Sequence, residues 1–184
     1  MLNSDTRLTK FWLKNLTSSI YKKKKFGIAS PLSNNAGFFS FPTENIDNYE
    51  IFKKKISMDN YSNGILSKSK ILKNPILHTA NGFCMYIKRS VLNKIGLFDE
   101  IAFPHGYGEE NDFCMRAYKN SFYSIISTSS YVFHFKTKSF DPNLRIDLIN
   151  SSQKTLRIKH PEYFDLSKKY LNSQRIKNLR NLKK

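Results

Sequence analysis

The sequence has few acidic residues and no long apolar run. Of its 184 residues only 14 are Asp or Glu, against 31 Lys and Arg, so the formal net charge is +17. This excess attracts anions, whether nucleic acid, an anionic membrane or a phosphorylated substrate, and does not choose among them. No stretch approaches the ~20 consecutive apolar residues that span a bilayer, and the N-terminus MLNSDTRLTK has no signal-peptide core. We therefore expect a cytoplasmic protein.

Cysteine is also scarce. Cys84 and Cys114 are too few for a disulfide framework, which excludes the small disulfide-stabilised folds. Both lie in apolar settings, GFCMYI and DFCMRA, and are predicted to be buried, reduced thiols. A chain of this length buries roughly 70% of its extended surface, enough for one domain with a substantial core.

Apolar spacing predicts an α/β fold. Residues four apart form one stripe, which indicates a helix that begins almost at the N-terminus with Asp5 or Thr6 as its cap. The stripe consists of Leu8, Trp12, Leu16 and Ile20. Short apolar runs predict strands at FGIAS, GFCMYIKR, FYSIIS and YVFHFK, and SVLNKIG predicts a short helix that Gly96 ends.

Two segments depart from this pattern. Residues 45–74 are polar and rich in lysine with no sustained period, and we interpret them as an excursion or lid. Near the C-terminus Ile176, Leu179 and Leu182 recur at three-residue spacing among basic side chains. This is typical of a helix that lies on anionic lipid, and equally of a helical tail packed on its own domain.

Acids and glycines gather in one region. Five of the fourteen acidic residues lie between Asp99 and Asp112, around the stretch FPHGYGEENDFCMRA. Glu109 and Glu110 after a glycine fit the first turn of a helix, where the macrodipole favours carboxylates by ~0.3–1 kcal/mol. Asp112 can also pair with Arg116 four residues on. The preceding segment FPHGYG contains glycines and aromatic residues, which instead favours acids that line the edge of a cleft. Spacing alone does not decide between a helix N-terminus and such a site.

An ordered series of motifs carries a resemblance. The chain has NGFCMYI, IKRS, GLFDE, GEEND and MRA in sequence between Thr79 and Ile125. These resemble the C-terminal half of the catalytic domain of family 2 glycosyltransferases, enzymes of the GT-A fold. In that family a turn and strand precede an IRR helix, a GGFDE element, and a Gly-acid-acid-x-Asp element that opens a helix ending in RA.

The resemblance extends to both sides, from about Leu2 to Ser139. LNSDT is similar to the NSDT version of the family's metal-binding DxD motif, and PLSNNAGFFSFP resembles a loop of members that act on bacterial surface polysaccharides. The resemblance implies a partial GT-A domain over residues 1–140, with a mixed sheet flanked by helices. A basic helical extension would follow over residues 141–184. In the family, nucleotide-binding βαβ units precede the DxD motif, so most of that N-terminal half is expected to be missing here.

The resemblance also implies roles for individual residues. Asp5 would bind Mg²⁺ or Mn²⁺ with His134 as a second ligand, and Asn3, Asp5 and Gly82 would lie at the nucleotide-diphosphate sugar. Glu110 would be the catalytic base, the family's second acid after glycine. Because this chain has Glu-Glu where many relatives have Glu-Asp, Glu109 remains an alternative base. The expected roles of Glu109 and Asp112 are acceptor positioning or local hydrogen bonding.

The implied partners follow from this chemistry. The acceptor would be a glycan or a lipid-diphosphate-linked sugar in bacterial cell-surface polysaccharide synthesis. The protein would also make peripheral contact with an anionic membrane and would bind a separate N-terminal half or partner chain.

A second class of function is nucleic-acid binding, since 15 Phe and 10 Tyr interleave with the basic residues. Against it, lysines are spread along the chain and no nucleic-acid-binding motif appears. A third is a non-catalytic remnant that binds a partner subunit.

Overall fold

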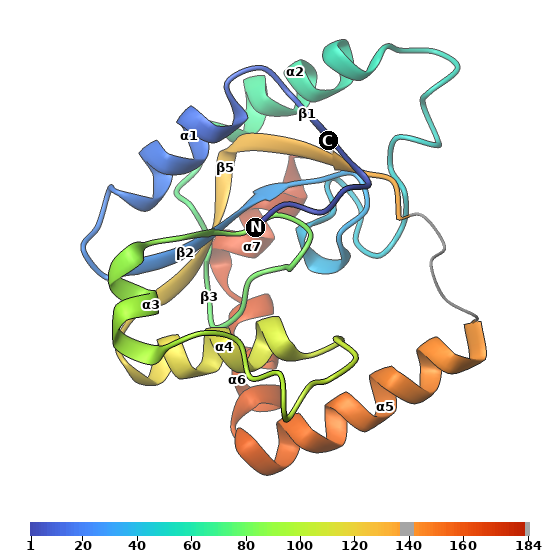
Figure 1. The fold of residues 1–184 in the computed structure, drawn as a ribbon. Helices are drawn as coiled ribbons and strands as arrows, with labels where there is room; N and C mark the ends of the chain where they lie inside the picture. Colours follow the sequence, from blue (N-terminus) through green and yellow to red (C-terminus); the bar gives the residue numbers. More distant parts are fainter. Residues whose placement is uncertain (137–141, 183–184) are drawn as a thin grey trace.

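The computed structural model describes residues 1–136 and 142–182, which form a curled mixed sheet with helices on both sides (Figure 1). The strands are β1 (Thr6–Leu8), β2 (Phe26–Leu32), β3 (Ile76–Leu77), β4 (Tyr86–Ile87) and β5 (Tyr123–His134). The helices are α1 (Trp12–Ile20), the 3-10 turn η1 (Gly37–Phe39), α2 (Met58–Ser69), α3 (Arg89–Ile95), α4 (Glu109–Lys119), α5 (Pro142–Lys159), α6 (Tyr163–Leu171) and α7 (Gln174–Asn181). The expected α/β class, with a mixed sheet flanked by helices, is confirmed. The expected boundary at residue 140 and the end of the matched stretch, 137–139, lie outside the described residues.

The sheet is built around β5 and β2, which run parallel to each other. The strand order is β1-β5-β2-β4, and β3 also pairs with β5; these other pairings are antiparallel. Ile28 of β2 packs in a cluster with α3 and α4, whereas Ala29 and Leu32 pack in the larger cluster on the other face. Because helices cover both faces, every residue of β2 is buried, as its unbroken apolar run predicts.

The strands expected at FYSIIS and YVFHFK are one strand, β5. The prediction of a break was wrong because the polar residues between them have hydrogen-bond partners in neighbouring elements. The Thr128 hydroxyl donates to the Leu72 carbonyl over 3.1 Å, and the Ser130 hydroxyl donates to the Trp12 carbonyl over 2.8 Å. The pairing of β5 with β2 shifts at this point, so the strand continues through an irregularity.

The first helix begins later than the apolar stripe predicts. Leu8 belongs to β1 and is exposed, while α1 starts at Trp12 after Phe11, which has a left-handed φ of 61°. Neither expected cap acts as one, and the Thr6 hydroxyl donates instead to the Asn3 carbonyl over 2.7 Å. The predicted helix is confirmed from Trp12 onward, where Leu16 and Ile20 of the apolar stripe are buried.

The segment 45–74 contains a packed helix, α2, so its interpretation as a stretch without a period was wrong. Tyr61 and Ile65 are four residues apart and buried against the core. Ser69 is buried as well, and its hydroxyl donates to the Thr128 carbonyl of β5 over 2.7 Å. The helix was hidden because only a narrow stripe is apolar and a buried serine resembles a surface residue.

Other local expectations are confirmed. The helix α3 ends at Gly96, whose φ of 76° is the left-handed conformation that glycine adopts without strain. Cys84 and Cys114 are buried free thiols, whose pKa burial raises to about 12. The helix expected after Gly108 is α4, which begins at Glu109.

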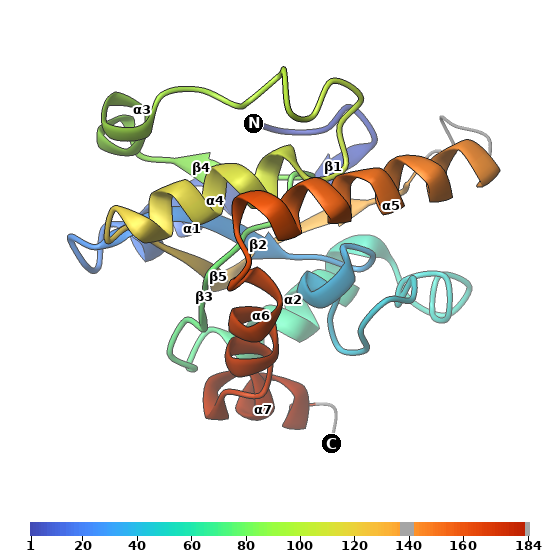
Figure 2. The same cartoon turned by 90° about the horizontal axis from the view of Figure 1, so that it is seen from below.

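The C-terminal helices pack on the rest of the chain. Figure 2 shows α5 beside α4, and α6 and α7 stacked below the sheet. Ile176 and Leu179 are buried in the same core cluster as Leu16 and Phe133, and Leu182 packs against that cluster. Of the two readings of this stripe, packing on the domain is correct, and the buried side chains cannot contact lipid.

Candidate active site

Asp5 and His134, the two expected metal ligands, lie side by side. The antiparallel register of β1 on β5 places Thr6 opposite His134, and the Phe135 amide donates to the Asp5 carbonyl over 2.9 Å. As a result His134 Nε2 lies 3.4 Å from Asp5 Oδ1. Asn34 supports the histidine, because its side-chain oxygen accepts from the His134 amide over 2.8 Å.

The other ring nitrogen of His134 determines what Nε2 can do. Nδ1 lies 2.8 Å from the carbonyl oxygen of Asn35, which only accepts, so Nδ1 carries a proton. In the neutral ring Nε2 is then an acceptor that faces the carboxylate of Asp5, another acceptor. This arrangement is favourable when a cation lies there, either a second proton on the ring or a metal ion.

The geometry fits a metal ion as well as a proton. Adjacent ligands of an octahedral ion bound at 2.0–2.1 Å lie roughly 3 Å apart, close to the 3.4 Å between these two atoms. In the part of the chain that the structure describes, no group of three or more His, Cys, Asp or Glu could hold a metal. If Asp5 and His134 hold an ion, they would supply two ligands, and phosphate and water would supply the others.

A stacked ring connects this pair to Gly82. The ring of His134 stacks on that of Phe83, with centroids 5.1 Å apart and planes at 24°. The Asn3 amide donates to the Phe83 carbonyl over 2.9 Å. The N-terminal segment therefore runs beside residues 83–85, and it brings together Asn3, Asp5, Gly82 and His134.

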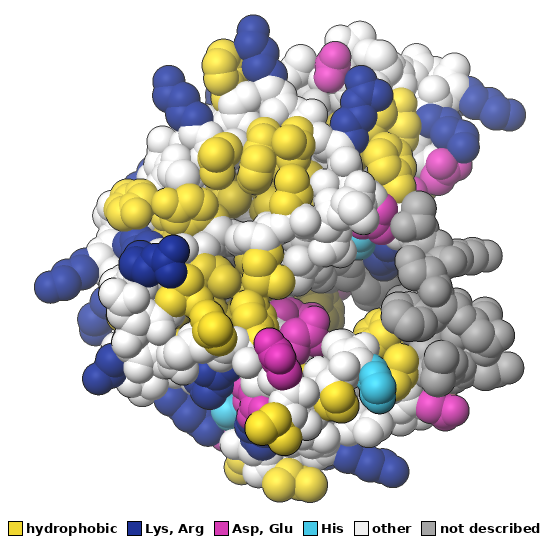
Figure 3. Space-filling model, viewed as in Figure 1, with side chains coloured by type: hydrophobic (Ala, Val, Ile, Leu, Met, Phe, Trp, Pro, Cys, Tyr) yellow, Lys and Arg dark blue, Asp and Glu magenta, His cyan; other side chains and the backbone are white. Residues whose placement is uncertain are grey.

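Glu110 lies against Gly82. A β-carbon added to Gly82 would be 3.8 Å from both Cβ and Cγ of Glu110, so the backbone here closely covers the glutamate side chain. Burial, and secondarily the charge of Glu109, raise the pKa of Glu110 to about 7. A carboxyl group with a pKa near neutrality is suited to proton transfer. Figure 3 shows acidic side chains gathered at the centre of this face, over the start of α4.

Glu109 is used differently, although it is the adjacent residue. Its Oε2 accepts a hydrogen bond from the Gly108 amide over 3.0 Å, and its carboxylate lies against Gly106. It therefore satisfies a backbone donor at the start of α4. Its charge also contributes to the raised pKa of Glu110.

Asp112 is fully buried, and two cations and a histidine contact its carboxylate. Arg116 and His160 each donate to its carboxylate, at 2.8 and 2.9 Å, and Lys159 Nζ lies 2.9 Å away. Burial raises its pKa, but these hydrogen bonds outweigh that effect and hold the pKa below the ordinary value. Arg116 also donates to the carbonyls of Ile95 and Leu97. For Asp112 we expected either acceptor positioning or local hydrogen bonding. These contacts support local hydrogen bonding, which joins α4 to the end of α5.

Further contacts near Glu110 come from residues that the sequence did not single out. The Asn111 side-chain oxygen accepts from the hydroxyls of Thr79 and Tyr163, at 2.6 and 3.0 Å. Burial, and then the charge of Glu110, raise the pKa of Tyr163, so this ring is near the glutamate. Only the return of α6 toward α4 brings Tyr163 here, and no local pattern predicts it.

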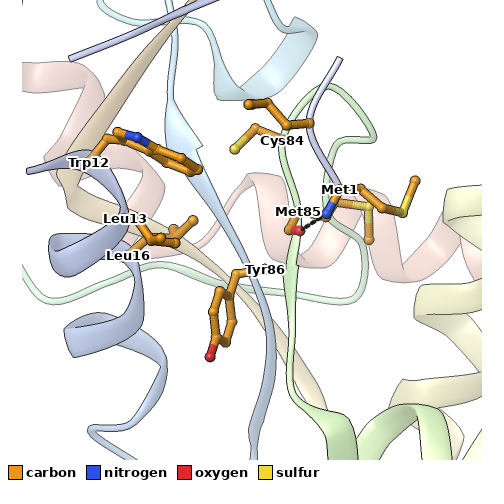
Figure 4. A pocket seen from close by; sticks show the side chains of 8 residues that line it. Met1, Trp12, Leu13, Leu16, Cys84, Met85 and Tyr86 are labelled. Atoms are coloured by element: carbon orange, nitrogen blue, oxygen red, sulfur yellow. Dashed lines mark hydrogen bonds between the residues drawn. The ribbon is translucent and has the colours of Figure 1, made fainter. Parts of the chain in front are cut away.

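An apolar pocket of about 190 Å³ is lined in part by residues 84–86, which directly follow Phe83. It lies between α1 and the N-terminal segment, and Figure 4 shows Trp12, Leu13 and Tyr86 around it. The terminal ammonium of Met1 donates to the Met85 carbonyl over 2.9 Å, which holds the N-terminal segment in place. Figure 3 shows a yellow apolar patch over this part of the surface.

Comparisons of the chain with protein-family models, with curated proteins and with solved structures gave no match. Among the described residues, no helix is long and apolar enough to cross a membrane. The case for a function therefore depends on the arrangement of Asp5, His134 and Glu110.

Proposed function

We propose that this chain is an inverting glycosyltransferase of family 2, with GT-A architecture. It would transfer a sugar from a nucleotide-diphosphate sugar to a hydroxyl of a glycan or lipid-linked acceptor in bacterial surface polysaccharide synthesis. One observation carries the proposal: two residues expected to share a metal have their polar atoms 3.4 Å apart. The expected base is linked to that pair through the stacked ring of Phe83 and its neighbour Gly82.

Glu110 is the base in this proposal. Its carboxylate takes the proton of the acceptor hydroxyl while that oxygen forms a bond to the anomeric carbon. The bond from this carbon to the diphosphate oxygen breaks on the opposite face, which inverts the configuration. A raised pKa favours proton uptake by Glu110, and the fraction of ionised base is substantial at neutral pH.

Asp5 and His134 hold the donor end of the site. A bound Mg²⁺ or Mn²⁺ would offset the negative charge that develops on the departing nucleoside diphosphate. The Asn35 carbonyl fixes the ring of His134 so that Nε2 points toward Asp5. Asn3 and Gly82 lie beside this pair and would contact the donor.

A partner chain, which the resemblance implies as one possibility, is part of the proposal. The apolar pocket at Met1, Trp12 and Tyr86 supports it, since Met1 and Leu13 are exposed there. Exposed apolar patches of this kind mark interaction sites. We place the complex in the cytoplasm, next to membranes that carry lipid-linked acceptors.

The test is donor turnover. Release of nucleoside diphosphate from a panel of nucleotide sugars is measured with Mn²⁺, with and without lipid-diphosphate-linked sugar acceptors. Loss of a general base lowers turnover by about 10²–10⁴-fold, so Glu110→Gln is expected to be nearly inactive. Glu109→Gln should retain most activity, because the Glu109 carboxylate accepts a backbone hydrogen bond from Gly108. Asp165→Asn, an exposed acid on α6, is the control.

Equal activity of Glu110→Gln and wild type would contradict the assignment of the base. If the purified chain has no turnover, binding of the donor is measured instead, with Asp5→Asn as the variant. Metal-dependent donor binding that is unaffected by Asp5→Asn would contradict the assignment of the metal site.

A further inference from the structure

A second pocket, of about 380 Å³, lies at the opposite end of β2 from the carboxylate region. Three segments that are far apart in the sequence form it: the turn after α1, the turn after α2 and the start of α7. Its cationic lining residues are Lys22, Lys23, Lys70, Lys73 and Arg175. In Figure 3, Lys and Arg side chains also occur along the left border, where Figure 1 places the turn between α1 and β2.

The charges in this pocket are uncompensated. None of its lining residues is Asp or Glu. None of the five cations makes an ion pair with a carboxylate in the part of the chain that the structure describes. By contrast, Arg116, Lys159 and Arg180 do pair with acids. A hollow lined by one sign of charge over apolar walls concentrates the field and attracts the opposite ion.

Two of the cations are held in position. Arg175 is partly buried at the start of α7, and its Nη1 donates to the Asn74 carbonyl over 3.1 Å. Its other guanidinium donors form no hydrogen bond with the described residues, so they remain for a ligand, in the planar fork that suits phosphate. The Nζ of Lys23 lies 5.8 Å from the centre of the Phe26 ring, which forms a buried wall.

The rim of the pocket is apolar as well as basic. Ile71 is 77% exposed between Lys70 and Leu72, in the turn that follows α2. Exposing a large aliphatic side chain among lysines suits a ligand that joins a phosphorylated group to an apolar part.

We propose that this pocket binds a ligand bearing two or more phosphate charges, either a lipid headgroup or a soluble oligophosphate. The lysines and Arg175 would contact the phosphate oxygens, and Ile71 would contact an attached apolar group. The site is separate from Asp5, His134 and Glu110, so this inference does not depend on the proposed glycosyl transfer.

The test compares two variants of equal charge. One replaces Lys22, Lys23, Lys70 and Lys73 by Gln; the control replaces Lys14, Lys54, Lys55 and Lys94, exposed lysines outside the pocket. Calorimetry measures binding of inorganic triphosphate. Cosedimentation measures binding to phosphatidylcholine vesicles with and without cardiolipin, a lipid whose headgroup carries two phosphates. Circular dichroism and the melting temperature check that both variants fold, and single Lys70→Gln and Lys73→Gln variants replace any that does not.

Wild type and control should bind alike, while the pocket variant binds more than about tenfold more weakly, since each charge-assisted contact contributes roughly a factor of ten. Binding of triphosphate alone identifies a soluble ligand. Binding to cardiolipin vesicles that triphosphate displaces identifies a lipid headgroup. The proposal is overturned if both variants lose affinity equally, which indicates non-specific attraction, or if wild type binds neither probe.

Discussion

His134 Nε2 lies 3.4 Å from Asp5 Oδ1, although the two residues come from opposite parts of the sequence. A strand of three residues, β1, is sufficient to bring them together, because its antiparallel register on β5 is specific. The Asn35 carbonyl then determines which nitrogen of His134 faces the carboxylate.

This pair predicts stabilisation by divalent metal. At ten times its dissociation constant, a bound ion stabilises the folded state by about 1.4 kcal/mol. The melting temperature of wild type should therefore rise with added Mn²⁺, while those of Asp5→Asn and His134→Ala rise much less. Scanning calorimetry over a Mn²⁺ titration checks this, with Asp165→Asn as the control. An equal rise in all four proteins would contradict the metal site.

The raised pKa of Glu110 predicts a pH-dependent stability difference. The folded state keeps this proton up to about pH 7, whereas the ordinary value is 4.5. The folded protein therefore binds more protons between these values and loses stability as pH rises through them. Glu110→Gln should be more stable than wild type at pH 8 by roughly 1–2 kcal/mol, below the full shift because the side chain is partly solvated, and equally stable at pH 4. Urea unfolding at both pH values checks this.

The same ionisation predicts the pH profile of activity. A base must be deprotonated to act, so turnover should rise as pH increases through about 7. Removing the neighbouring charge with Glu109→Gln should move the rising limb to lower pH. A profile that is flat from pH 5 to 8 would argue against Glu110 as the base.

Substitution of Asp112 is expected to cause a large loss of stability. It is fully buried and contacts Arg116, Lys159 and His160, so Asp112→Ala leaves positive charge uncompensated. Breaking a buried ion pair in this way costs roughly 3–5 kcal/mol. Urea unfolding should show it at pH 7, whereas exposed Asp165→Ala should remain within about 0.5 kcal/mol of wild type.

The backbone at Gly108 is expected to accept only glycine. Its φ is 145°, and an added β-carbon would approach Ser152 Oγ to 2.6 Å and Phe103 Cε1 to 2.9 Å. Gly108→Ala should destabilise by roughly 1–3 kcal/mol. Gly64→Ala in α2 is the matched control, because nothing lies within 4 Å, and it should stabilise by about 0.5–1 kcal/mol. Thermal unfolding distinguishes the two directions.

Substitution of Leu179 tests whether the apolar stripe of α7 packs in the core. The side chain is fully buried in the main core, so Leu179→Ala should cost roughly 2–5 kcal/mol. Exposed Ile158→Ala on α5 is the control and should change stability little. Unchanged unfolding of Leu179→Ala would mean that α7 does not pack as described.

Local sequence signals predicted a substantial part of this fold. The apolar run of β2, the helix end at Gly96 and the acidic first turn of α4 were all recognisable, because each depends on residues within one turn or strand. The candidate residues Asp5, His134 and Glu110 came from motif order, which is also a property of the sequence.

Tertiary contacts decided the rest. The polar residues inside β5 and on the buried side of α2 have partners only after distant elements pack, so they resembled a break and a loop. The enclosure of Asp112 depends on the end of α5, and the raised pKa of Glu110 depends on burial beside Gly82. The sequence by itself determined which carboxylates are present and where α4 begins. Only the tertiary structure decided that Asp112 is paired with two cations, Arg116 and Lys159, while the pKa of Glu110 rises to about 7, because burial and neighbouring charge are properties of the packed molecule.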